Sequence, residues 1–119
     1  MQEELDRIAA ALAEAGEVVA RVRRGAVTVT LKTGGDPVTE VDTAVDAVLR
    51  KRLPRPGEGW LSEETADDGS RLRMTRVWVV DPLDGTREFV AGIPEWAISV
   101  ALVEEGSAVA GGVFNPASG

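Results

Sequence analysis

The two longest apolar patterns in the first half of this chain of 119 residues are helical, whereas those in the second half are typical of strands, and this order limits the folds that the chain can adopt. Two early stretches, Glu3 to Arg24 and Thr39 to Leu53, repeat apolar residues at the three- and four-residue spacing of amphipathic helices. After Val77, apolar residues instead run together or alternate with small and polar ones, as in strands. A chain of this length buries one core, so residues 1–119 are expected to form one α+β unit in which two helices pack on a sheet.

The predicted strands differ in how they are covered. Val77 to Val80 is a continuous β-prone run, typical of a strand buried on both faces, and Trp60 and Leu61 are placed in a short strand before it. Trp96 to Leu102 and Val109 to Phe114 flank a turn and predict a β-hairpin. We therefore expect a mostly antiparallel sheet.

Three further segments are assigned from turn and strand signals. Alternation from Val27 to Leu31 predicts a strand that a break at Gly34 to Pro37 ends. Thr65 to Thr75 is predicted as polar loop, and a short helix is expected to open after Asp84 and run through Phe89.

Composition excludes several classes of function. The chain has 13 Lys and Arg against 20 Asp and Glu, a net charge of −7, which is the wrong sign for binding a nucleic-acid polymer. It contains no cysteine and no histidine, which excludes disulfides, thiolate or imidazole metal sites, a cysteine nucleophile and a Ser-His-Asp triad. Clustered carboxylates instead favour Mg²⁺. No long apolar run or signal-peptide pattern is present, so no membrane partner and a cytoplasmic location are expected.

The segment from Asp81 to Thr86 carries the strongest chemical signal. It follows a buried strand, places two carboxylates three residues apart and enters a helix. Asp81, Asp84 and the Leu83 carbonyl are hard oxygen ligands suited to Mg²⁺, and the Gly85 and Thr86 amides are suited to phosphate. A helix cap in a tight turn would explain Asp84 without a metal. It would not explain Asp81, whose charge at the end of an apolar strand is costly unless something pairs with it.

Other acidic residues are weaker candidates when taken alone. Glu63 and Glu64 fit ordinary solvated surface, but Glu63 would join Asp81 around an ion if their two strands are neighbours. Asp42 fits a capping box that starts at Thr39. Lys32 stands beside a Gly-rich loop and could reach a phosphate, but it is left outside the core site.

Together these residues resemble the inositol monophosphatase superfamily. Asp81 to Thr86 matches its D-P-x-D-G-T/S motif, Glu63 and Glu64 match its upstream acidic pair, and Val38 to Asp42 matches its V-T-x-x-D element. The segment Asp84 to Phe89 is most similar to the D-G-T-R/K-E-F variant of the bacterial 3′(2′),5′-bisphosphate nucleotidase branch.

The resemblance implies a role for each matched residue in hydrolysis of a phosphomonoester by metal-activated water. Asp42 and Thr86 would orient the attacking water, and Gly85 with Thr86 would bind phosphate. The resemblance also implies at least two Mg²⁺ ions and inhibition by Li⁺. The implied metal ligands are Glu63, Asp81, the Leu83 carbonyl and Asp84, with Asp81 bridging two ions. The substrate would be a small phosphorylated metabolite such as inositol monophosphate or adenosine 3′,5′-bisphosphate.

One departure from the family pattern concerns completeness. The later W-D-x-A-A/G motif, whose Asp completes the second metal site, has no counterpart before Gly119. The chain is therefore expected to be the first half of a layered αβαβα sugar-phosphatase fold, with little activity alone and a tendency to self-associate, for which a homodimer is one assembly.

Two alternative functions stay open. A metal- or phosphate-binding remnant without turnover fits the missing motif. A haloacid-dehalogenase-type phosphatase would need its two Asp residues at D-x-D spacing, whereas Asp81 and Asp84 are three apart.

Overall fold

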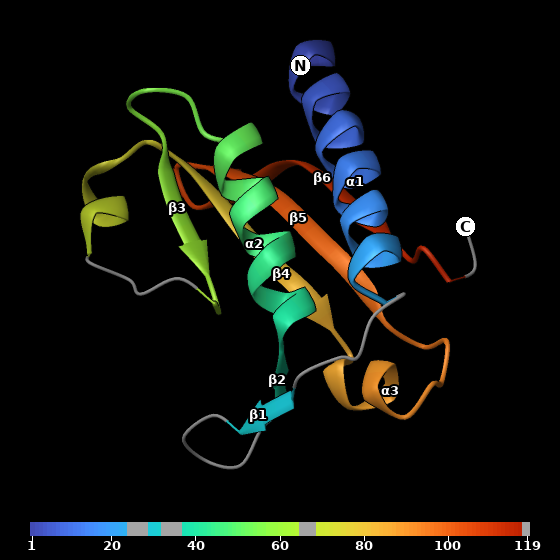
Figure 1. The fold of residues 1–119 in the computed structure, drawn as a ribbon. Helices are drawn as coiled ribbons and strands as arrows, with labels where there is room; N and C mark the ends of the chain where they lie inside the picture. Colours follow the sequence, from blue (N-terminus) through green and yellow to red (C-terminus); the bar gives the residue numbers. More distant parts are fainter. Residues whose placement is uncertain (24–28, 32–36, 65–68, 118–119) are drawn as a thin grey trace.

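The computed structural model describes residues 1–23, 29–31, 37–64 and 69–117. Helices α1 (Gln2–Arg23) and α2 (Glu40–Arg52) lie next to each other over one face of a four-stranded sheet (Figure 1). The strand order is β3 (Gly59–Ser62), β4 (Arg76–Asp84), β5 (Ala97–Glu104) and β6 (Ser107–Phe114). Within this sheet of described residues β3 and β4 pair in parallel and the other neighbours pair antiparallel, so the expected two-helix, mostly antiparallel α+β architecture is confirmed.

The core lies between the two helices and the covered face of the sheet. Both helices bury their apolar stripes, and along β5 the buried side chains alternate with half-buried small ones. Burying one such aliphatic or aromatic side chain contributes about 1.5–3 kcal/mol to stability. Helices and strands this short are marginally stable in isolation, so this burial is what holds them in place. Residues of this core include Leu12, Val45, Leu49, Trp78, Ile98 and Leu102.

The parallel pair β3–β4 brings two strand ends to the same edge of the sheet. Ser62, the last residue of β3, pairs with Val80, so Glu63 follows the end of β3 beside Asp81, which continues β4 and pairs with Ser99 of β5. Strand β4 continues beyond the expected end at Val80, through a register irregularity, until Asp84 pairs with Ala97 of β5. Sequence analysis did not predict this extension, because Pro82 and the two acidic residues near it have low propensity for strands. The extension forms because β5 supplies a partner for it in the folded chain.

Gly85 makes the turn from β4 into the short helix α3 (Thr86–Val90). Its φ of +93° lies in the left-handed region, and a Cβ at this position would stand 2.8 Å from the Glu95 carbonyl oxygen. Only glycine fits this turn without strain, since the backbone approach leaves no room for a side chain.

Smaller elements refine the sequence expectations. Strand β1 (Val29–Leu31) pairs antiparallel with β2 (Pro37–Thr39). Sequence analysis did not predict β2, which begins at Pro37 in an edge position that tolerates its missing N–H, and the rest of the predicted break, Gly34 to Asp36, lies outside the described residues. The predicted polar loop contains a 3₁₀ helix, η1 (Ser70–Arg73). Arg24, Val27 and Lys32 lie outside the described residues. None of the described helices is long and apolar enough to cross a membrane.

Candidate metal and phosphate site

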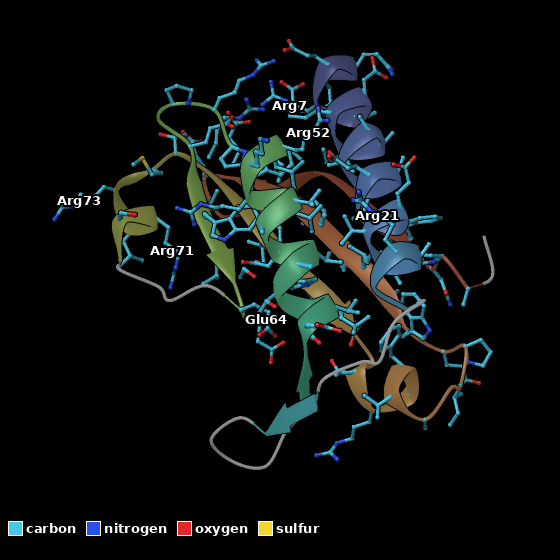
Figure 2. The ribbon with its side chains drawn as sticks, viewed as in Figure 1. Arg7, Arg21, Arg52, Glu64, Arg71 and Arg73 are labelled. Carbon is cyan, nitrogen blue, oxygen red and sulfur yellow. The ribbon has the colours of Figure 1, made fainter. Side chains whose placement is uncertain are left out.

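Three elements deliver polar groups to the carboxyl ends of β3 and β4. Helix α2 supplies Asp42 from its first turn, β3 is followed by Glu63, and β4 supplies Asp81 and the Leu83 carbonyl. Figure 2 labels Glu64 just beyond the end of β3, on the side where α2 begins. Glu63 was expected to join Asp81 only if their two strands are neighbours. The structure meets this condition, because β3, which ends just before Glu63, pairs directly with β4, which carries Asp81.

Thr86 connects α2 to the end of β4. Its hydroxyl lies 3.1 Å from Oδ1 of Asp42 and 3.0 Å from the carbonyl oxygen of Leu83. A hydroxyl has one proton to donate, so these two acceptors share it. The two residues assigned to water orientation, 44 positions apart in the sequence, therefore meet in the fold.

Asp42 keeps the helix position that the capping interpretation gives it and also meets Thr86, whereas Asp84 does not cap a helix. Asp42 is the third residue of α2, is only 1% exposed and accepts the bond from Thr86. The residue that caps α3 is Gly85, and no side chain caps that helix, so the capping alternative for Asp84 is wrong. Asp84 is exposed beside a cleft of about 380 Å³ that Gly85 also lines.

Asp81 occupies an unfavourable electrostatic position. Its Oδ1 is buried and has no hydrogen-bond partner in the described part of the chain. Burial, followed by the neighbouring carboxylates of Asp84 and Glu63, raises the pKa of Asp81 to about 6, and Asp42 adds to the shift. A backbone hydrogen bond at Leu83 opposes the rise in pKa only partly. The fold therefore concentrates negative charge where a cation would relieve it.

The chemistry of these groups suits Mg²⁺. The carboxylates and the Leu83 carbonyl are hard oxygen donors, and the partnerless Oδ1 of Asp81 is a buried acceptor that a cation would satisfy. Among the described residues, however, no three acidic side chains already stand as a group that could hold an ion. The side chains of Glu63 and Asp84 are exposed and would have to turn inward to bind an ion. The site therefore fits a metal by the type of its donor atoms and by their location, while its side chains are not yet arranged around an ion.

Sequence analysis missed a second polar contact next to this site. The hydroxyl of Ser62 donates a hydrogen bond to Asp46 Oδ1 at 2.5 Å, and both residues are buried. The available signal was the position of Asp46 four residues after Asp42, within the apolar stripe of α2.

Comparison with known proteins identifies relatives for the whole chain. Residues 1–119 match the family described as "Inositol monophosphatase family". The chain is 44% identical to the histidinol-phosphatase of Mycobacterium tuberculosis over 114 residues, covering 92% of this chain and 43% of that protein. It is 57% identical to the 3′-phosphoadenosine 5′-phosphate phosphatase of Mycobacterium leprae over 54 residues, covering 44% of this chain and 20% of that protein.

A solved structure shares the fold. An IMPase/NADP phosphatase complexed with Mg²⁺ and phosphate superimposes with a TM-score of 0.88 at 23% identity, covering 98% of this chain and 45% of that one. The chain thus spans less than half the length of the proteins it resembles.

Proposed function

The chain belongs to the inositol monophosphatase family, and from this we propose that it forms the metal- and phosphate-binding part of a Mg²⁺-dependent phosphomonoesterase. The observation that carries the proposal is the meeting of Asp42, Thr86 and the Leu83 carbonyl beside a crowded Asp81. Glu63, Asp81, the Leu83 carbonyl and Asp84 would hold the metal, and the Gly85 and Thr86 amides would receive the phosphate.

The Thr86 hydroxyl is arranged to position a water molecule. Because its proton is donated to Asp42 and Leu83, the lone pairs of its oxygen can accept a hydrogen bond from water. Asp42 is buried and held by this contact, so it keeps the hydroxyl in that orientation. When bound, Mg²⁺ supplies neutralisation of the phosphoryl charge and activation of the water, which explains how the chemistry proceeds in a chain without histidine.

The substrate class is a small phosphorylated metabolite. The relatives carry the names of different phosphatases, one for histidinol phosphate and one for an adenosine bisphosphate. The Arg87 to Phe89 segment favours adenosine 3′,5′-bisphosphate as the first substrate to test, with inositol monophosphate and histidinol phosphate beside it. Family membership and the three-residue spacing of Asp81 and Asp84 argue against an aspartyl-phosphate mechanism.

The proposal is tested by calorimetric titration with Mg²⁺ and by phosphate release from these three substrates. Wild-type chain should bind Mg²⁺, Asp81→Asn should lose most of that binding, and Asp42→Asn should retain binding but reduce any turnover. Glu17→Gln, on the exposed face of α1, serves as a control of equal charge change. Binding of Mg²⁺ without turnover of any substrate supports the alternative of a binding unit that is inactive by itself. Absence of both would overturn the proposal.

A further inference from the structure

Helix α2 buries a second carboxylate that the proposed site does not use. Asp46 lies one turn after Asp42 on the same face, and the two residues are 7% and 1% exposed. Burying a carboxylate costs several kcal/mol unless hydrogen bonds replace its water. A residue of this kind in an otherwise apolar stripe calls for a specific partner.

One such partner is Ser62, at the last position of β3. Its hydroxyl donates to Asp46 Oδ1 at 2.5 Å and accepts a hydrogen bond from the Glu64 backbone N–H at 3.3 Å. The single proton of the hydroxyl is therefore directed to α2, and a lone pair is directed to the turn after β3. Ser62 is 5% exposed, so little water competes for either bond.

The two hydrogen bonds fix the backbone on both sides of Glu63. Ser62 also pairs with Val80, the residue before Asp81, so the Ser62–Glu64 turn is tied at once to α2 and to β4. The side chain of Glu63 is exposed and makes its approach to Asp81 from this turn. The position of the turn consequently decides how far the Glu63 carboxylate must reach.

We infer that Asp46 and Ser62 are positioning residues that hold Glu63 for the metal. This inference rests on the proposed Mg²⁺ site and extends it to two residues that are not among its proposed metal or phosphate ligands. Contacts that orient a metal ligand typically change metal affinity by about 10- to 100-fold when removed. A contact that merely stabilises the fold would lower the free energy of unfolding without changing Mg²⁺ affinity.

A double-mutant cycle with Mg²⁺ titration separates these roles. Ser62→Ala should weaken Mg²⁺ binding by about tenfold, and Ser62→Thr, which keeps the hydroxyl, should bind nearly as wild type. In a Glu63→Gln background, Ser62→Ala should cause no further loss because the residue it positions has already lost its charge. Urea unfolding in EDTA checks that each variant is folded.

Hydrogen exchange of the wild-type chain tests the same contact without any substitution that could impair folding. Hydrogen exchange at the Glu64 amide should be slowed even in EDTA, since its bond to Ser62 precedes metal binding. Wild-type affinity in Ser62→Ala, an undiminished loss in the Glu63→Gln background, or unprotected exchange at Glu64 would each overturn the positioning role while leaving the proposed function intact. A wild-type chain that binds no Mg²⁺ would instead overturn both.

Discussion

The two ends of β4 handle charge in opposite ways. At its start, Arg76 lies between glutamates from three other elements or loops, at 3.6 Å from Glu4, 3.3 Å from Glu58 and 3.9 Å from Glu104. Trp78 adds a hydrogen bond from its indole N–H to Glu58 at 2.9 Å. This end joins α1, the loop before β3 and the hairpin through complementary charges.

The other end of β4 gathers charges of one sign. The groups that raise the pKa of Asp81 include three carboxylates, Asp84, Glu63 and Asp42. Figure 2 shows Arg7 and Arg52 near the end of the helices remote from Glu64. We call the end of β4 at Arg76 the paired end and the end at Asp81 and Asp84 the acidic end. The difference in charge indicates that the paired end stabilises the fold, whereas the acidic end lowers its stability, as is common at functional sites.

The largest effect is expected at Trp78, which is fully buried and supports the paired end. Trp78→Ala should lower the free energy of unfolding by about 3–5 kcal/mol, because it opens a cavity and removes the donor to Glu58. Trp78→Phe, which keeps most of the apolar volume, should cost clearly less. Urea unfolding in EDTA measures both, and equal losses would show that the indole N–H matters more than the volume.

A smaller loss is expected from Arg76, whose side chain is 28% exposed. Arg76→Met should destabilise the chain by about 1–3 kcal/mol, since it keeps the apolar stem but takes away the cation beside Glu58 and one of the cations beside Glu4. Glu104→Gln, at the weakest and most exposed contact, provides the control and should cost under about 0.5 kcal/mol. An unchanged midpoint for Arg76→Met would remove the distinction between the two ends.

The acidic end should respond with the opposite sign. Asp81→Asn should stabilise the metal-free chain by roughly 1 kcal/mol, after allowance for its partial exposure, while removing most of the stabilisation by Mg²⁺. The pKa of Asp81 is raised from 3.8 to about 6, so the folded chain holds a proton that the unfolded chain has released. Metal-free wild type should therefore lose stability from this group as the pH rises through that range.

This pH dependence supplies the check on Asp81. The stability difference between Asp81→Asn and wild type should be close to zero near pH 4 and reach its full value above about pH 6, matching the pKa shift. Chemical denaturation in EDTA across this range measures it. A destabilised Asp81→Asn chain at pH 7 would show that its charge is compensated within the protein.

The smallest effect is expected at the surface pair of Arg52 and Glu14, which joins α2 to α1. The two side chains are 55% and 35% exposed, so Arg52→Gln should cost only about 0.5 kcal/mol or less. The loss should disappear in 1 M salt, where exposed charges are screened. A loss as large as that of Arg76→Met would mean that exposure does not separate the two contacts.

The sequence alone determined the features that depend on neighbours a few residues away. The apolar stripes of α1 and α2 report helical periodicity, and the alternation in β5 reports a half-covered strand. The segment from Asp81 to Thr86 places a strand end, two carboxylates and a glycine turn within six residues, so its chemistry could be anticipated locally. These patterns were sufficient for the fold class and for the candidate residues between Asp81 and Thr86, whereas Asp42 and Glu63 were assigned to the site only through the family resemblance.

Only the tertiary structure decided which of those residues meet. The contact between Asp42 and Thr86 depends on how α2 packs over β4, and the place of Glu63 beside Asp81 depends on the parallel pairing of β3. The bond between Asp46 and Ser62 joins a helix to a strand end, so neither local pattern reveals it. Residue spacing reports which face a side chain occupies, whereas packing of the elements sets the distances between faces and with them the charge that Asp81 experiences.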